Sequence, residues 1–257
     1  MAEGIQKISA VMIVLNEREN LTRSIPSLRF CDEIIVVDSG SSDGSVELAR
    51  QLGCTVVHRE FDHFGSQKSH AASLARNDWV FSLDADEEVT PALASEIQSL
   101  IQEPNLNSIW IRSRLVFLGR IFRFGRESRV RVLRIFKRSA GDFDRASVHE
   151  KVIIPNPSEV TTRHHILHFS YPDLSHYFKK MNRYTSLGAK RLQPNTSPLE
   201  ALLRASLFPI KFLQFYILHL NFMNSWQGLA WSALSTYAYL LKFLKTAKIG
   251  ENGVTRV

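Results

Sequence analysis

The chain has 257 residues, of which 44% are hydrophobic and 22% are charged, with 32 Lys and Arg against 25 Asp and Glu. This composition is that of a globular protein and excludes general disorder. The two cysteines, Cys31 and Cys54, exclude a disulfide framework, and their spacing is not that of a zinc or thioredoxin-type site. The net charge of +7 favours a polyanionic partner, and nucleic acids, anionic membranes and phosphorylated substrates all satisfy it.

The first apolar run, residues 8–15, is short and is followed at once by Asn16-Glu17-Arg18-Glu19. A secretory signal needs a cationic start, a longer apolar core and a cleavage site of small residues. The run is instead typical of a buried strand. We therefore expect an unprocessed chain that faces the cytosol.

Strand-like and helix-like segments alternate over the first hundred residues. The strand-like runs are residues 8–15, 33–37, 55–58 and 79–83, and the helix-like stretches are residues 19–28, 44–52 and 65–75. This alternation predicts βαβ units and a mostly parallel, doubly wound α/β sheet. Ligands of such sheets bind beyond the carboxyl ends of the strands, so the loops of interest are residues 16–19, 38–43, 58–64 and 84–88.

Arginine is concentrated in residues 112–138, where nine arginines and one lysine accompany a single acid, Glu127. Aromatic and aliphatic residues alternate with these cations, which is typical of strands or of a hairpin with one basic face. An RNA-binding groove would show the same interleaving. However, the chain has no recognisable RNP, KH or zinc pattern, and we expect no nucleic-acid partner.

The last quarter of the chain holds two long apolar stretches, residues 207–222 and 228–244, which are rich in Leu, Phe, Tyr and Trp. The uncharged span of the second, residues 228–241, is shorter than the roughly 20 residues of a membrane crossing. One interpretation is amphipathic helices on a membrane surface, with aromatic side chains at the interface: Trp226, Trp231, Tyr237 and Tyr239. The alternative is a helical subdomain packed on the sheet.

The strongest chemical motif is Asp84-Ala85-Asp86-Glu87-Glu88, which follows an apolar strand directly. If the chain stays extended, Asp84 and Asp86 point the same way and repel each other unless a cation neutralises them. Mg²⁺ or Mn²⁺ commonly binds one or two carboxylates together with phosphate oxygens. Acids that favour the dipole of the following helix are the alternative.

A second motif, Val37-Asp38-Ser39-Gly40-Ser41-Ser42-Asp43-Gly44, follows another predicted strand. A carboxylate at such a strand tip can accept a hydrogen bond from the uracil imide or from a ribose hydroxyl, and the glycines allow close backbone approach. An ordinary capped βα loop is the alternative. The loop lacks the glycine pattern of dinucleotide sites and the Gly-Lys-Ser/Thr of phosphate loops, which argues against NAD enzymes and ATPases.

Together with Val14-Leu15-Asn16-Glu17, Gly65-Ser66-Gln67-Lys68 and Val148-His149-Glu150, these motifs resemble family 2 glycosyltransferases of the GT-A fold. The resemblance covers nearly the whole chain and is closer to the bacterial lipopolysaccharide core β-1,4-glucosyltransferases. It implies a GT-A domain over residues 1–170, with a nucleotide-sugar half at 1–105 and an acceptor half at 106–170. Residues 171–257 would form a helical, aromatic-rich extension.

The resemblance also implies roles for individual residues. Asn16, Glu17, Asp38, Ser39, Lys68, Asp84 and Ala85 would bind the UDP-sugar, and Asp86 with Asp84 would hold Mg²⁺ or Mn²⁺. Glu150 is the candidate base that removes the acceptor proton, and Asp86 joins it in catalysis. A surface Glu paired with an arginine is the alternative for Glu150. On the acceptor side we expect Arg129, Arg131, Arg134 and His149.

The expected reaction is an inverting transfer of a hexose, glucose by resemblance, to the inner-core heptose of a lipopolysaccharide precursor. The acceptor would be an anionic glycolipid, and the enzyme would lie peripherally on the inner face of the bacterial inner membrane. Alternative acceptors are a polyprenyl phosphate, a capsule precursor or a peptide, and a non-catalytic polyanion-binding module is the remaining reading. Relatives usually carry Asp-Gly where this chain has Asn224-Ser225, and this departure bears on acceptor binding or helix packing.

Overall fold

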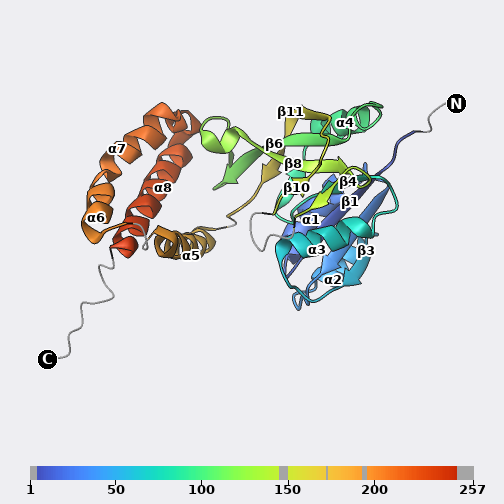
Figure 1. Cartoon of the computed structure of the whole chain (residues 1–257), viewed down its shortest axis with the longest axis horizontal. Coiled ribbons are helices and arrows are strands. Elements are labelled where there is room, and N and C mark those ends of the chain that lie inside the picture. The colour runs from blue at the N-terminus through green and yellow to red at the C-terminus, as the bar shows by residue number, and fades with distance from the viewer. Residues whose placement is uncertain (1–4, 145–149, 172, 193–195, 248–257) are drawn as a thin grey trace. The chain divides into compact units, whose positions relative to one another are not determined.

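The computed structural model describes residues 5–144, 150–171, 173–192 and 196–247. The chain folds as two compact units (Figure 1). The first unit comprises Met1–Arg114 and Val130–His168, and the second comprises Leu115–Arg129 and Phe169–Val257.

A mixed sheet in the order β3-β2-β1-β4-β8-β6-β11-β5 forms the centre of the first unit. Strands β1 to β4 pair in parallel, whereas β8 runs antiparallel to both β4 and β6, and β5 runs antiparallel to β11. A separate two-stranded ribbon joins β9 and β10. The strand bounds are β1 Ile8–Val14, β2 Glu33–Asp38, β3 Thr55–His58, β4 Trp79–Ser82, β5 Glu87–Val89, β6 Ser108–Phe117, β8 Val130–Lys137, β9 Asp142–Phe143, β10 Val152–Ile153 and β11 Glu159–His168.

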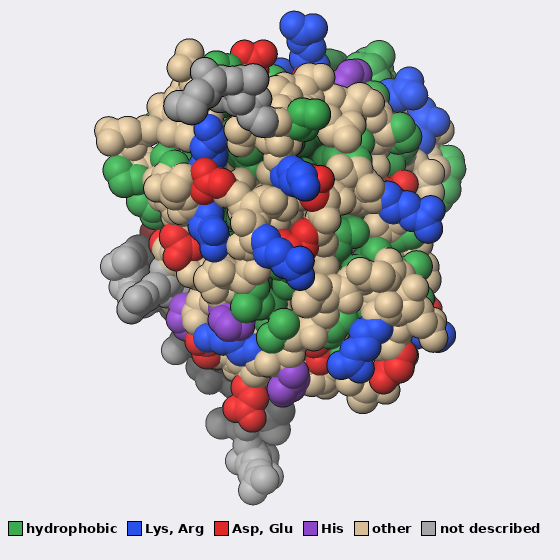
Figure 2. Space-filling model, turned by 90° about the vertical axis from the view of Figure 1, so that its right-hand side faces the viewer, with side chains coloured by type: hydrophobic (Ala, Val, Ile, Leu, Met, Phe, Trp, Pro, Cys, Tyr) green, Lys and Arg blue, Asp and Glu red, His purple; other side chains and the backbone are tan. Residues whose placement is uncertain are grey.

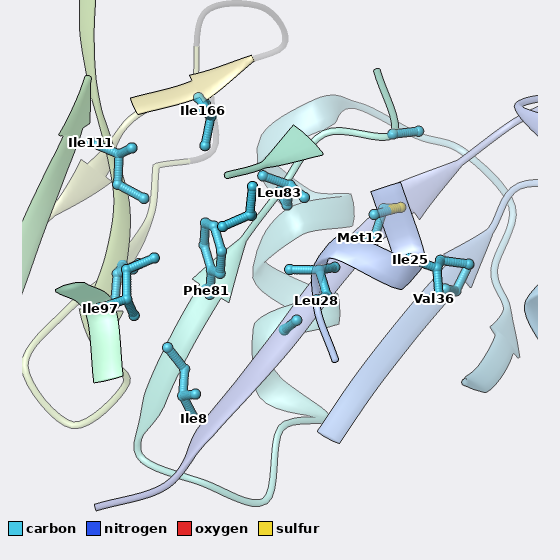
Figure 3. Packing of buried hydrophobic residues seen from close by; sticks show 14 of the residues in the cluster. Ile8, Met12, Ile25, Leu28, Val36, Phe81, Leu83, Ile97, Ile111 and Ile166 are labelled. Atoms are coloured by element: carbon cyan, nitrogen blue, oxygen red, sulfur yellow. The ribbon is translucent and has the colours of Figure 1, made fainter. Parts of the chain in front are cut away.

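Helices cover both faces of this sheet. Side chains of α1 (Arg18–Ser27), α2 (Ser45–Gln51) and α4 (Pro91–Leu100) belong to one core cluster, and those of α3 (Phe64–Ser73) belong to the cluster on the other face. Figure 3 shows the larger cluster, in which Phe81 of β4 lies among aliphatic side chains from strands and helices. Because both faces are covered, the central strands read as nearly unbroken apolar runs rather than as alternating ones.

The second unit is a hairpin followed by helices. The C-terminal part of β6 pairs with β7 (Arg120–Ile121), and η1 (Arg126–Ser128) follows. The helical elements are α5 Leu174–Leu192, α6 Pro198–Ser206, α7 Phe208–Leu213, η3 Gln214–Leu218, η4 Asn221–Asn224 and α8 Ser225–Thr246. Phe117 and Phe122 of the hairpin pack edge-on against Trp231 of α8, with ring centroids 5.1 and 6.0 Å away. This aromatic core explains why the hairpin folds with the C-terminal helices. The domain division expected from the sequence instead included the hairpin in residues 106–170.

The expected fold class is confirmed: an α/β sheet flanked by helices is followed by a helical extension rich in aromatic residues. One detail of the extension differs from expectation. Trp231, expected at a membrane interface, is buried in the aromatic core, whereas Trp226 is 60% exposed. Among the described residues, no single helix has the length and apolar composition of a membrane span, although the bent pair Pro198–Ser206 and Phe208–Leu218 meets both criteria together.

Asn224 and Ser225 mark the departure from the usual Asp-Gly. The Asn224 side chain is buried and accepts hydrogen bonds from the backbone N–H groups of Arg123 (3.1 Å) and Phe124 (3.3 Å). It also donates to the carbonyl oxygen of Phe124 at 3.0 Å. Asn224 therefore holds the hairpin to the start of α8, which is a packing role. Ser225 has φ +63° and ψ −157°, a conformation that favours glycine.

Candidate active site

Three neighbouring parallel strands of the first unit end at one edge of the sheet, and the predicted site residues follow them. In the register of β1 and β2, Val14 lies opposite Asp38, and in that of β1 and β4, Val11 lies opposite Ser82. Asn16 and Asp84 come two residues after the ends of β1 and β4. The fold therefore brings the three predicted loops to the carboxyl edge, where ligands bind to such sheets.

The loops after β1 and β2 are joined by hydrogen bonds. The backbone N–H of Asn16 donates to Ser41 Oγ, and that of Ser42 donates to Asn16 Oδ1, each at 2.8 Å. The backbone N–H of Glu17 donates to Ser45 Oγ at 2.9 Å. Asn16 has φ +56°, a left-handed conformation that asparagine adopts more readily than most residues. Asn16 therefore fixes the relative position of the two loops.

Asp38 is oriented by its own loop. Asp38 is 3% exposed, and its carboxylate accepts hydrogen bonds from the backbone N–H of Gly40 (2.8 Å) and from that of Ser41, which reaches both oxygens (3.0 and 3.3 Å). Gly40 has φ +101°, so a side chain at this position would strain the turn. An ionised carboxylate offers about four acceptor positions. Asp38 therefore keeps capacity for one further donor.

Gln67 is a site residue that sequence reasoning did not single out. Its side chain is fully buried and donates to Ser39 Oγ and to the carbonyl oxygen of Arg59, each at 3.0 Å. It also accepts a hydrogen bond from the Arg59 guanidinium. Gln67 thus connects α3 to the loop after β2. The adjacent Lys68 was the only signal available, because a buried Gln has no distinctive sequence pattern.

Lys68 lies at the centre of an ionic cluster although it is only 5% exposed. Its Nζ is 2.8 Å from Asp84 Oδ1 and 2.7 Å from Glu150 Oε1. Burial alone would lower the pKa of Lys68, but Asp84 and Glu150 raise it. The ammonium therefore stays charged and brings the predicted donor-side Asp84 and the predicted base Glu150 to one place.

Arg134 of β8 completes this cluster. Its guanidinium contacts the other oxygen of Asp84 and lies 2.6 Å from Glu87 Oε1. Burial alone would raise the pKa of Asp84, but Arg134 and Lys68 hold it well below its usual range. Glu87 is 2% exposed, and burial raises the pKa of its carboxyl against the opposing effect of Arg134. Arg134 therefore pairs with two carboxylates of the Asp84–Glu88 motif. From the sequence, it is expected on the acceptor side instead.

The Asp84-Ala85-Asp86 segment is not extended, because the N–H of Glu87 donates to the carbonyl oxygen of Asp84 at 3.0 Å and closes a turn. Ala85 is buried in this turn. The two aspartates consequently have different partners. Both oxygens of Asp84 contact cations, whereas Asp86 Oδ2 lies 3.2 Å from His168 Nε2.

His168 reaches Asp86 because it pairs with Glu87 in the register of β5 and β11. Its ring is about one third exposed, and the Asp86 side chain about one quarter. Burial alone would lower the pKa of His168, but the hydrogen bond to Asp86 raises it. The pair is therefore accessible from solvent, in contrast to the neighbouring Lys68 and Arg134.

The other residues predicted on the acceptor side are not in this cluster. Arg131 is exposed and lies over the ring of Trp110, 5.5 Å from its centroid. Arg129 is exposed and follows η1 in the second unit. His149 lies outside the described residues. The structure thus brings together Lys68, Asp84, Arg134 and Glu150, with Asp86 beside them.

The residues at this edge fit a divalent cation that is held mainly by its substrate. Asp86 and His168 supply one carboxylate and one imidazole that solvent can reach. The part of the chain that the structure describes contains no group of three or more His, Cys, Asp or Glu placed to hold a metal. Mg²⁺ and Mn²⁺ tolerate such sparse protein ligation because phosphate oxygens and water complete their shell.

A mixed α/β sheet with acidic residues at its carboxyl edge is the frame of many enzymes that bind nucleotides. The comparison with known families is specific: the model for "Glycosyl transferase family 2" matches residues 9–183. The chain therefore belongs to glycosyltransferase family 2 and is a glycosyltransferase.

Individual relatives agree with this family. The chain is 27% identical over 262 residues to an uncharacterized glycosyltransferase of Rickettsia typhi, covering 96% of this chain and 88% of the relative. It is 28% identical over 252 residues to the lipopolysaccharide core biosynthesis glycosyltransferase LpsC of Rhizobium meliloti, covering 94% and 91%.

Among solved structures, glucosyl-3-phosphoglycerate synthase of Mycobacterium tuberculosis, in complex with Mn²⁺, UDP and glucosyl-3-phosphoglycerate, is 25% identical with a TM-score of 0.37. That match spans 43% of this chain and 44% of the other.

Proposed function

We propose that the protein transfers a hexose, most simply glucose, from a UDP-sugar to the inner-core heptose of a lipopolysaccharide or lipooligosaccharide precursor, with inversion at the anomeric carbon. The observation that carries this proposal is the edge of the first unit, where the buried Lys68 and Arg134 hold both oxygens of Asp84 and Glu150 contacts Lys68. Beside them, solvent reaches Asp86 and His168, and Asp86 contacts neither cation. The similarity to LpsC supports the choice of acceptor.

The donor would lie across the three strand ends. Asp38 has a fixed carboxylate with acceptor capacity for the uracil or ribose, and Asn16, Glu17 and Ser39 belong to the loops around it. Lys68 and Arg134 place two positive charges against Asp84, next to the turn at Ala85. Fixed cations at this place would stabilise the negative charge that develops on the departing UDP.

Asp86 and His168 would hold the divalent cation, because both oxygens of Asp84 already contact Lys68 and Arg134. We therefore assign Asp84 a supporting role, in which it fixes the two cations and the turn. When bound, Mg²⁺ or Mn²⁺ would neutralise charge on the diphosphate leaving group. A neutral His168 is needed for ligation, so its proton must leave when the metal binds.

Glu150 would act as the base that accepts the proton of the acceptor hydroxyl. Its carboxylate is ion-paired to Lys68 at 2.7 Å, which holds it beside Asp84. Its side chain is 15% exposed, so part of it stays accessible to an acceptor. A base on the face opposite the leaving group gives the inverted product.

The acceptor is an amphiphile, and we place the enzyme peripherally at the cytoplasmic face of the inner membrane, where such precursors are elongated. The first test uses purified protein with UDP-glucose, Mn²⁺ and de-glucosylated core lipid. Asp86→Asn should reduce turnover by about 10³-fold or more, since it removes a charged ligand. Asp173→Asn, an exposed aspartate of the second unit, is the matched control and should keep full turnover.

The acceptor is tested by mass spectrometry of lipopolysaccharide from a deletion strain. The proposal expects a core that lacks one hexose, restored by the wild-type gene and not by the Asp86→Asn gene. A core of unchanged mass would contradict the lipopolysaccharide assignment. A changed polyprenyl phosphate, capsule precursor or peptide in the same strain would identify the acceptor instead.

A further inference from the structure

The helices α6, α7 and η3 expose their large apolar side chains. Leu203 is 61% exposed, Ile210 62% and Leu218 75%. Six of the exposed apolar residues recur every three or four positions and therefore follow one side of the helices: Leu199, Leu203, Leu207, Ile210, Leu213 and Ile217. We call these six residues the apolar stripe.

The opposite side of α6 carries small residues. Ala201 and Ala205 are buried against α8, where they belong to one cluster with Phe243 (Figure 1). A surface helix of a water-soluble protein normally buries its large apolar side chains and exposes polar ones. The helix α6 does the reverse, so the apolar stripe requires a partner that is itself apolar.

The charge of the chain is concentrated in the same unit. The second unit has 15 Lys and Arg against 4 Asp and Glu, whereas the first has 17 against 21. Acidic and basic side chains are interspersed on the face drawn in Figure 2. By contrast, residues 201–250 contain no Asp or Glu and five cations. The partner of the second unit is therefore anionic as well as apolar.

Three of these cations lie close together over aromatic rings of α8, and one of them, Arg204, is also ion-paired with Glu200 at 2.6 Å. Arg204 and Lys242 lie over the ring of Phe243, at 5.9 and 4.7 Å from its centroid, and Lys211 lies 5.6 Å from that of Tyr239. Burial lowers the pKa of Lys242, and the nearby Arg204 and Lys211 lower it further. Long basic side chains that run along apolar surface and end in a common charge are suited to phosphate headgroups.

We propose that α6, α7 and η3 lie in the interface of an anionic bilayer, with the apolar stripe among the acyl chains and the cluster of Arg204, Lys211 and Lys242 at the headgroups. A second copy of the chain would bring identical cation clusters together, whereas an anionic bilayer neutralises them. The proposal rests on the proposed function only in that the acceptor is itself a membrane lipid.

These helices lie on the membrane rather than across it. The two segments are bent by 47° relative to each other, and one side of α6 packs its alanines against α8. Arg204 and Lys211 interrupt the segment at positions that a span would place inside the hydrocarbon. Only one side of the helices is thus available for lipid, as in interfacial helices.

The test is co-sedimentation of the full chain with vesicles of phosphatidylglycerol and phosphatidylcholine, or of phosphatidylcholine alone. We expect binding to the anionic vesicles that weakens with salt, and about tenfold or more weaker binding for the double variant Leu203→Asp/Ile210→Asp. Ile5→Asp, at a residue of the first unit that is 86% exposed, is the matched control and should bind as wild type. Lys211→Gln/Lys242→Gln should reduce the preference for anionic vesicles and the salt dependence.

Binding of the Leu203→Asp/Ile210→Asp variant at wild-type strength would overturn the proposal. A second result would also overturn it. In that result, the wild-type protein is a dimer without vesicles, the Leu203→Asp/Ile210→Asp variant is a monomer, and neither protein binds lipid. The affinity for UDP-glucose, measured on the same samples, should be identical in the wild type and in the Leu203→Asp/Ile210→Asp variant. If the wild-type protein binds vesicles but transfers no hexose, the proposed function is refuted, whereas the proposal that these helices bind an anionic bilayer is supported.

Discussion

In the first unit, charged side chains are brought inside: Lys68, Glu87 and Arg134 are largely buried and neutralise one another with Asp84. In the second unit, large apolar side chains are left outside, and the alanines of α6 are buried instead. The fold of the first unit therefore fixes charged side chains in place, as the proposed site for a nucleotide diphosphate requires. This exposed apolar surface is the one that we propose to lie on an anionic bilayer. The excess positive charge of the whole chain belongs to the second unit alone.

The largest expected effect is loss of the buried cation of the first unit. Arg134→Met leaves the carboxylates of Asp84 and Glu87 partly uncompensated, and we expect the free energy of unfolding to fall by about 3–5 kcal/mol. Denaturant unfolding of the wild type and of Arg134→Met measures this difference in the free energy of unfolding. Arg131→Met, three residues earlier on the same strand and exposed, is the control and should cost less than about 1 kcal/mol.

The same variant has a predicted pH dependence. The pKa of Asp84 is depressed in the folded wild type, so its stabilisation is present above the unfolded value of about 3.9 and is lost as the pH falls. The stability difference between wild type and Arg134→Met should therefore narrow below about pH 4. A difference that widens on acidification would contradict the ionic account.

The second effect separates buried from exposed aromatics in the second unit. Trp231→Ala removes the ring at the centre of the aromatic core and should lower the free energy of unfolding by about 3 kcal/mol. Trp226→Ala, at an exposed position, should change it by no more than about 0.5 kcal/mol. UDP-glucose affinity should be unchanged in both variants. Equal losses for the two tryptophans would show that the core is placed wrongly.

A third, smaller effect is stabilising. Ser225 adopts φ +63° and ψ −157°, so Ser225→Gly should relieve backbone strain and raise the free energy of unfolding by about 1 kcal/mol. Ser225→Ala keeps the Cβ and should give no such gain. Thermal unfolding of the three proteins provides the measurement. A gain for alanine equal to that for glycine would place the cause in the hydroxyl and not in the backbone.

The smallest effect concerns Asp43, in the loop that follows β2. Partial desolvation opposes ionisation, but hydrogen bonds from Ser45 and from the backbone N–H of Arg18 hold the pKa of Asp43 below its ordinary value. The stabilisation is therefore present above pH 4 and disappears as the pH falls further. The difference in stability between wild type and Asp43→Asn should shrink as the pH falls below about 4, and Glu47→Gln serves as the control for an exposed acid nearby.

Much of the first unit was predictable because its signals are local. The parallel strands and first three helices begin and end within two residues of their predicted bounds, since apolar runs and turn residues mark them directly. The acids at the strand tips were predictable for the same reason. Lys68 and Glu150 came from the resemblance to the family, which no local pattern of charge would have supplied.

The partners of these acids were not predictable. Arg134 reaches Asp84 across 50 residues because β8 pairs antiparallel with β4, and the register of that pairing is not written in the sequence. The turn that sends Asp86 to His168 rather than beside Asp84 depends on a backbone hydrogen bond to Asp84. In the second unit, composition alone could not distinguish the buried Trp231 from the exposed Trp226, because both belong to the same aromatic-rich helix.

The most direct test of the central claim is a calorimetric titration of UDP-glucose into wild-type protein and Asp86→Asn, each with and without Mn²⁺. We expect tight binding only for the wild type with Mn²⁺, and weak, metal-independent binding for the variant, because Asp86 is the aspartate of this segment whose oxygens are not both held by Lys68 and Arg134. Equal affinity of wild type and variant in the presence of Mn²⁺ would contradict the central claim.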